Sequence, residues 1–395
     1  MKTEAITITQ LQRLKVRSLV GWGLLGVFLA IFVLALMLLL TDIGEDHPIM
    51  KVISMGVITL WPLLWIWRKF SRYNISGKKF IGALPEDQYW IRWILLVIGL
   101  VILSIGCFYL IWYPLSFVIP NIVEKIFLRD RVFSSASGAP FPLYIIGLKI
   151  FLGVVIAPFV EELCFRGIIL QRWAAKWGLT KSIILSSVLF GILHFNLVGS
   201  TFFGFVMALL YIHTRSLLVP IVFHALNNAI AYGLEGIFFF INGPVAPTIG
   251  DLQSGVWIGA ICLCITVPLA VIYSVKYWPR TEWKLWFPTG SVAFPDQEYT
   301  EWIPGIKKHL ILLSLLSVIV GITIQLPIIS ITSYMDIITS LIAALVILFI
   351  VPFMVIAIPS GIYWLCKRKQ MPGFIPLVWI IWVLLSYFYI IGKML

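Results

Sequence analysis

Residues 143–171 read LYIIGLKIFLGVVIAPFVEELCFRGIILQ, a run that is long and apolar enough to cross a bilayer as a helix. Near its end this run carries three charged residues, Glu161, Glu162 and Arg166. An ionisable side chain inside the hydrocarbon of a membrane is costly unless it is paired or hydrated. The charged residues of this span therefore mark a candidate functional site.

The rest of the chain is also too apolar for a water-soluble protein. Hydrophobic residues make up 61% of its 395 residues and charged residues only 12%, whereas an ordinary globular protein has about 25% charged residues. Its mean hydropathy is +1.02. The net charge of +12 comes from short basic clusters between apolar runs. This pattern is typical of membrane proteins, and we expect no nucleic-acid partner.

The predicted fold class is an all-α polytopic membrane protein with about eleven transmembrane helices. A spanning helix needs about 20 apolar residues, and the candidates are centred on 19–41, 51–67, 90–113, 143–171, 182–198, 199–214, 217–234, 254–275, 309–330, 336–365 and 375–392. We divide the chain into an N-terminal three-span region (1–142), a core (143–235) and a C-terminal extension of about four spans (236–395).

The charge pattern predicts a multi-pass protein of the cell membrane with a cytoplasmic N-terminus and an extracytoplasmic C-terminus. Basic residues cluster at 68–79, 172–181, 276–308 and 367–369, and these segments alternate with connections that are poor in Lys and Arg. One predicted outer segment, 114–142, is an exception because it carries Lys125, Arg129 and Arg131.

Three of the predicted spans carry polar residues at a similar depth. The fourth holds Glu161, Glu162 and Arg166, the fifth holds Phe190 and His194, and the seventh holds His224 and Asn228. At about 1.5 Å per residue, Glu161, His194 and His224 lie roughly 15, 20 and 13 Å from the predicted cytoplasmic ends of their helices. We therefore expect these three helices to deliver their polar side chains to one layer of the membrane.

Such a group of residues is compatible with several kinds of chemistry. A carboxylate assisted by a histidine can deprotonate a water that attacks a peptide carbonyl, while a His–Asn pair stabilises the oxyanion. Glu161, His194 and His224 could instead bind a catalytic zinc ion, although no HExxH motif is present. The same carboxylates could relay protons or bind a cation in a transporter. Glu162 and Arg166, four residues apart, could also form a purely internal ion pair.

The order EExxxR, FxxxH and HxxxN resembles the motif set of the CAAX prenyl protease and bacteriocin-processing (CPBP, or Abi) family of intramembrane endopeptidases. The matching residues are Glu161, Glu162, Arg166, Phe190, His194, His224 and Asn228. The resemblance covers roughly residues 143–235, about a quarter of the chain. The four-span extension from about residue 254 departs from the usual size of the family.

The resemblance implies a role for each motif residue. Glu161 and His194 would activate water, and His224 and Asn228 would form the oxyanion hole. Glu162 and Arg166 would orient the site, with Phe190 as a further supporting residue. We expect no cofactor, with zinc as the alternative.

The resemblance also implies the class of substrate, a membrane-embedded, lipidated or amphipathic peptide that can reach a site at this depth. Two rival interpretations are a proton- or cation-coupled transporter and a bacteriocin-immunity protein without catalysis. A transporter is expected to show broken helices in two corresponding halves of the chain, and the sequence has no such internal symmetry.

Overall fold

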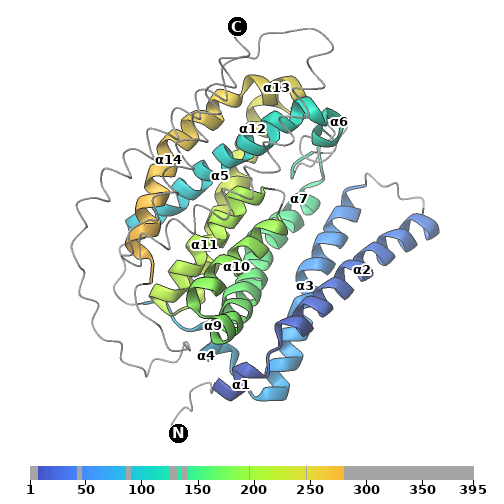
Figure 1. The fold of residues 1–395 in the computed structure, drawn as a ribbon. Helices are drawn as coiled ribbons and strands as arrows, with labels where there is room; N and C mark the ends of the chain where they lie inside the picture. The colour runs from blue at the N-terminus through green and yellow to red at the C-terminus, as the bar shows by residue number, and fades with distance from the viewer. Residues whose placement is uncertain are drawn as a thin grey trace, which may run out of the picture.

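The computed structural model describes residues 8–41, 47–85, 90–124, 132–134, 140–194, 196–245 and 247–279. Within these ranges every regular element is a helix, and the only strand-like feature is an isolated bridge between Ser134 and Pro140 (Figure 1). The all-α fold class is therefore confirmed. The predicted spans at 309–330, 336–365 and 375–392 lie outside the described residues.

Six described helices are long and apolar enough to cross a membrane, so the predicted count of about eleven is not confirmed. They are α2 (Val16–Leu40), α3 (Pro48–Tyr73), α5 (Trp90–Val118), the continuous helix Leu143–Trp177, α11 (Leu197–Thr214) and α14 (Val256–Tyr277). The predicted span at 182–198 is the shorter helix α10 (Leu179–Ile192). The span at 217–234 corresponds to α12 (Leu218–Asn242), which is not among these six.

The long helix from Leu143 to Trp177 changes its hydrogen-bond register four times along its length. It runs as α7 (Leu143–Ile150), the π-helix η2 (Phe151–Ile156), α8 (Ala157–Glu162), the π-helix η3 (Leu163–Leu170) and α9 (Gln171–Trp177). Pro158 lies in the first turn of α8 and cannot donate a backbone hydrogen bond. π-helical turns are rare in proteins, and those that occur are often found at functional sites. Glu161 and Glu162 lie at such a place, at the junction of α8 and η3.

Helices α2 and α3 form a hairpin at one side of the bundle (Figure 1). The indole N–H of Trp22 donates to the carbonyl of Trp61, the indole of Trp61 donates to the carbonyl of Trp22, and both distances are 3.0 Å. The two rings stack with centroids 5.1 Å apart. These reciprocal bonds satisfy both indole donors inside the apolar hairpin.

Helices α10 and α11 form a second hairpin, which packs closely because glycines lie at the contact. A Cβ atom at Gly191 would meet Thr201 Oγ1 at 2.0 Å and the carbonyl oxygen of Leu197 at 2.7 Å. The turn between the helices is held by Asn196, whose side chain donates to the carbonyl and hydroxyl oxygens of Ser104, each at 2.8 Å. The hairpin is thereby fastened to α5.

Most basic residues of the described segments gather at one end of the bundle, with Lys51 and Lys149 as exceptions. The last turn of α3, the junction of α9 and α10, and the last turn of α14 all lie at this end (Figure 1). The backbone N–H of Leu217 donates to the carbonyl of Ile81 at 2.8 Å. His213 bonds to the carbonyl of Tyr277 at 2.7 Å. Which side of the membrane this end faces is still predicted from the charge pattern alone.

Gly106 of α5 tests the packing of α5 against α14. A Cβ atom there would lie 2.7 Å from the Cγ atom of Leu263 and 3.1 Å from the backbone nitrogen of Leu263. We expect Gly106→Ala to lower the free energy of unfolding by about 1–3 kcal/mol through overpacking, measured as a lower Tm in detergent. Gly99→Ala in the same helix is the control, because its Cβ meets nothing within 4 Å. Equal melting temperatures for the two variants would contradict this packing.

Candidate active site

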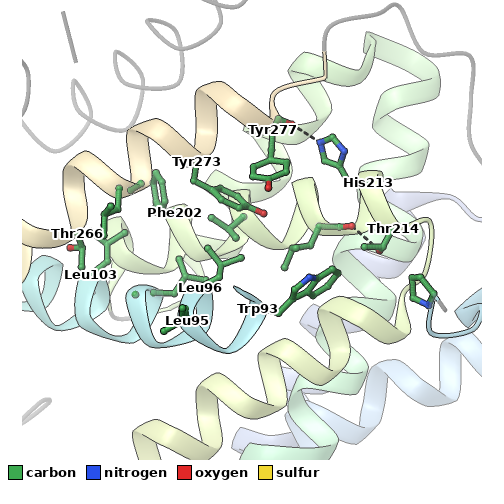
Figure 2. A pocket seen from close by; sticks show the side chains of 17 residues that line it. Trp93, Leu95, Leu96, Leu103, Phe202, His213, Thr214, Thr266, Tyr273 and Tyr277 are labelled. Carbon is green, nitrogen blue, oxygen red and sulfur yellow. Dashed lines mark hydrogen bonds between the residues drawn. The ribbon is translucent and has the colours of Figure 1, made fainter. Parts of the chain in front are cut away.

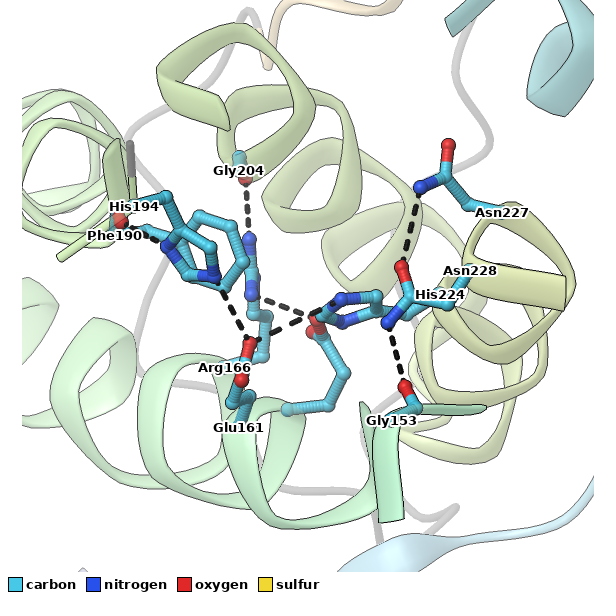
Figure 3. A network of polar contacts seen from close by, with 10 residues as sticks. Gly153, Glu161, Arg166, Phe190, His194, Gly204, His224, Asn227 and Asn228 are labelled. Atoms are coloured by element: carbon cyan, nitrogen blue, oxygen red, sulfur yellow. Dashed lines mark hydrogen bonds and ion pairs between the residues drawn. The ribbon is translucent and has the colours of Figure 1, made fainter. Parts of the chain in front are cut away.

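Glu161 lies between two imidazole rings that come from different helices (Figure 3). Its Oε2 atom is 3.6 Å from Nε2 of His194 and 3.9 Å from Nε2 of His224. Glu161 stands on α8, His194 follows the end of α10, and His224 lies on α12. The structure thus brings together three side chains that are up to 63 positions apart in the chain.

Glu162 is the buried centre of a second set of contacts. Its Oε1 atom accepts a hydrogen bond from Arg166 at 2.8 Å and contacts Nδ1 of His224 at 2.9 Å. The other end of the Arg166 guanidinium donates to the carbonyl oxygen of Gly204 at 2.8 Å. Glu162 and Arg166 have only 0% and 2% of their side chains exposed. Glu162 and Arg166 are therefore an internal ion pair that also fixes one histidine.

Phe190 supports His194 in two ways. Nδ1 of His194 lies 2.6 Å from the carbonyl oxygen of Phe190, and the two rings stack with centroids 4.3 Å apart. The guanidinium carbon of Arg166 lies 4.8 Å from the centre of the Phe190 ring. A cation over an aromatic face is attracted by the ring quadrupole, so Phe190 links the buried ion pair to His194.

These contacts determine which nitrogen of each imidazole carries a proton. A carbonyl oxygen only accepts hydrogen bonds, so Nδ1 of His194 must be the donor to Phe190. Nδ1 of His224 likewise donates to Glu162, which is an ionised carboxylate paired with Arg166. In a neutral ring the Nε2 atom then has only a lone pair. Both lone pairs lie near Glu161 Oε2, which has no hydrogen-bond partner among the described residues.

Three acceptor atoms that converge in this way need a hydrogen donor between them. A water molecule can supply two hydrogens, or one imidazole can carry an additional proton. Buried acceptors left without a donor would be costly in an apolar environment. The geometry therefore indicates a position for a bound water or a shared proton beside Glu161.

Asn228 lies one turn after His224, but its carboxamide is turned toward η2 (Figure 3). Its nitrogen donates to the carbonyl of Gly153 at 2.8 Å, and its oxygen accepts from the side chain of Asn227 at 3.3 Å. An amide nitrogen has two hydrogens, so one remains for another acceptor. The structure does not bring this amide against Glu161 or His194, and the predicted oxyanion role depends on that second hydrogen.

Sequence reasoning did not identify three residues that support the site. Gly153 and Gly204 act through backbone carbonyl oxygens, which leave no side-chain signature in a sequence. A Cβ atom at Gly153 would lie 2.1 Å from the hydroxyl of Tyr232, so a larger residue there would displace the Tyr232 side chain. Asn227 could have been found as a second amide inside a span beside the HxxxN motif.

The site opens on the side of Glu161 and His194. Their side chains are 29% and 33% exposed, whereas that of His224 is only 5% exposed. The neighbouring apolar side chains of Ile192 and Leu193 are also exposed. A peptide could approach the candidate water position from this side.

The zinc alternative requires three protein ligands around one ion at about 2.0–2.2 Å from each donor atom. Within the described ranges, no group of three or more His, Cys, Asp or Glu side chains is placed to hold a metal ion. Glu161, His194 and His224 would have to move closer together to do so.

Comparison with known proteins supports the class of protein that this site indicates. Residues 142–230 match the family model described as "Type II CAAX prenyl endopeptidase Rce1-like". The chain is also 36% identical over 84 residues to "Putative membrane peptidase YdiL" of Bacillus subtilis (strain 168). Both findings support the CAAX prenyl protease and bacteriocin-processing family, so the predicted resemblance is confirmed for this segment.

The matched segment is a limited part of each chain. The alignment with YdiL covers 20% of this protein and 34% of that relative, so the chain spans about a third of the length of the curated protein it matches. No solved structure matches the chain. All seven motif residues lie inside residues 142–230.

The protonation of the two histidines can be measured without a substrate. We expect Nδ1 of both His194 and His224 to carry a proton, because each faces an obligate acceptor. Nitrogen-15 NMR of histidine-labelled protein in detergent or lipid distinguishes the two tautomers, and His194→Gln and His224→Gln variants assign the signals. Neutral rings with the proton on Nε2 alone would contradict the described contacts.

Proposed function

We propose that this chain is an intramembrane endopeptidase that hydrolyses a peptide bond of a membrane-embedded, lipidated or amphipathic peptide. The observation that carries the proposal is the position of the buried Glu161 Oε2 atom between the Nε2 atoms of His194 and His224, on a side chain that is itself 29% exposed. The family match over residues 142–230 supports a protease.

In the proposed reaction, a water molecule donates hydrogen bonds to Glu161 and His194. Glu161 takes one proton as the water oxygen attacks the carbonyl carbon of the scissile peptide bond. The carbonyl oxygen becomes an oxyanion, and the peptide C–N bond breaks when the nitrogen receives the proton from Glu161. The other proton of the water stays on the new carboxyl group, so the products are a carboxylic acid and an amine, which become a carboxylate and an ammonium group when that proton passes between them, and the carboxylate of Glu161 is regenerated.

The oxyanion role of His224 follows from the charges around it. Glu161 and Glu162 contribute two negative charges and Arg166 one positive charge, so a proton on the imidazoles makes the group neutral. His224 contacts both carboxylates and is the best placed ring for that proton. The buried carboxylate of Glu162 would stabilise the imidazolium, as in hydrolytic triads, and its Nε2–H could then donate to the oxyanion.

Substitution of the reacting groups tests the mechanism. We expect Glu161→Gln, His194→Ala and His224→Ala each to reduce peptide cleavage by about 10²–10⁴-fold, since proton transfer and oxyanion stabilisation each contribute that much. The protein is reconstituted in liposomes with extracted membrane peptides, and new peptide ends are quantified by mass spectrometry.

His47→Ala is the matched control, because His47 is an exposed residue that caps α3. This variant is expected to cleave like the wild type. A second series adds a chelator and then zinc, and we expect unchanged cleavage in both steps. Wild-type turnover by Glu161→Gln would contradict the glutamate mechanism, and loss of activity with chelator that zinc restores would favour the metal route.

A further inference from the structure

A groove of about 640 Å³ lies between α5, α11 and α14 (Figure 2). This volume is in the range of pockets that hold small molecules. Its walls are formed mainly by apolar side chains of the three helices, among them Leu96, Leu100, Leu103, Phe202, Val206 and Leu269. None of the described residues that line it is an Asp, Glu, Lys or Arg.

The polar groups of the groove are gathered at one end. His213, Thr214, Tyr273 and Tyr277 line this end, close to one another (Figure 2). The remaining hydroxyl, that of Thr266, donates to the carbonyl of Cys262 in its own helix at 2.6 Å. The groove is thus apolar along its length and able to hydrogen-bond at one end.

The polar end coincides with the basic end of the bundle. Arg215 directly follows Thr214, and Lys276 directly precedes Tyr277. The ammonium of Lys276 lies 5.3 Å from the centre of the Tyr277 ring. Neither basic residue lines the groove itself, but the ammonium of Lys276 beside Tyr277 places a positive charge next to the polar end, and such a charge attracts anionic headgroups. Apolar walls, a hydrogen-bonding end and adjacent positive charge correspond to the parts of an anionic lipid.

The groove is separate from the candidate active site, although both use α11. Phe203 and Gly204 face the catalytic residues, since the Phe203 ring lies 4.8 Å from that of His224 and the Gly204 carbonyl binds Arg166. Phe202 and Val206 line the groove instead. Occupation of the groove therefore does not depend on the proposed proteolytic function.

We propose that this groove binds an anionic membrane glycerophospholipid, with an acyl chain between α5 and α14 and the phosphate group at the polar end, near Lys276 and the hydroxyls of Tyr273 and Tyr277. A hydrocarbon chain needs no hydrogen-bond partner along the apolar walls. At the polar end, the phosphate and glycerol oxygens accept from the hydroxyls of Tyr273 and Tyr277, since the donors of His213 and Thr214 already bond to carbonyl oxygens. The absence of a side chain at Gly99 contributes to the open volume, because a Cβ atom there would meet nothing within 4 Å.

The full chain is reconstituted in liposomes of phosphatidylglycerol or phosphatidylcholine that contain a trace of the same lipid with a photoactivatable acyl chain. After irradiation, mass spectrometry locates the labelled peptides. We expect phosphatidylglycerol to label α5 and α14 at the groove, about tenfold more than phosphatidylcholine does. Gly99→Trp fills the groove and is expected to lower this labelling about tenfold, a loss of about 1.4 kcal/mol of binding free energy.

Gly21→Trp is the matched control, because a Cβ atom at Gly21 also meets nothing within 4 Å. Gly21 lies on α2, which contributes no residue to the groove. It is expected to label like the wild type. Ala270→Phe fills the groove from α14 and serves if Gly99→Trp does not fold. Lys276→Glu is expected to remove the preference for phosphatidylglycerol but to leave labelling by phosphatidylcholine unchanged.

Two results would overturn the proposal. The first is equal labelling of the groove in wild type, Gly99→Trp and Ala270→Phe, which would show that the label does not enter it. The second is labelling of residues 309–395 or of a second protein copy in place of the groove peptides, which would mean that another chain segment covers this surface. Neither readout measures peptide cleavage. A failure of the proposed proteolytic function can therefore be told apart from a failure of the lipid proposal.

Discussion

Two neighbouring carboxylates inside a membrane helix impose the condition that the rest of this bundle satisfies. Each charge needs a partner, because an unpaired charge in an apolar environment is very costly. The Oε1 atom of Glu162 is paired with Arg166 and His224, while Glu161 faces His194 and His224. The partners come from η3, α12 and the end of α10, so these segments must meet α8 at one level of the membrane. The same contacts that stabilise the charges also place the groups that could activate water.

Close helix packing makes this arrangement possible. The guanidinium of Arg166 reaches the carbonyl of Gly204 because α11 approaches η3 closely, and a Cβ atom at Gly204 would come within 3.3 Å of that guanidinium. Gly153 in η2 permits a similar approach of α12 and accepts a hydrogen bond from Asn228. π-helical turns close i→i+5 hydrogen bonds instead of i→i+4, so η2 and η3 alter which side chains and carbonyls face the site.

The sequence predicted the parts of the site that depend on helical geometry. Similar predicted depths placed Glu161, His194 and His224 in one layer, and the spacing of four residues predicted the contact of Glu162 with Arg166. The π-helical segments were not predictable, because an apolar pattern does not reveal the hydrogen-bond register. The boundary expected near residue 198 was also wrong. Helix α10 ends at Ile192 and α11 begins at Leu197, where Asn196 caps α11 by accepting from the N–H of Gly199, a polar signal that hydropathy alone misses.

The central claim is that Glu161 and His194 act on the same water molecule. A double-mutant cycle measures this directly, from kcat/KM of the wild type, Glu161→Gln, His194→Gln and the double variant in liposomes. Residues that act as one unit are strongly non-additive. The account predicts that the double variant loses about as much activity as the more damaging single variant. Losses that multiply would show that the two side chains act independently and would contradict the account.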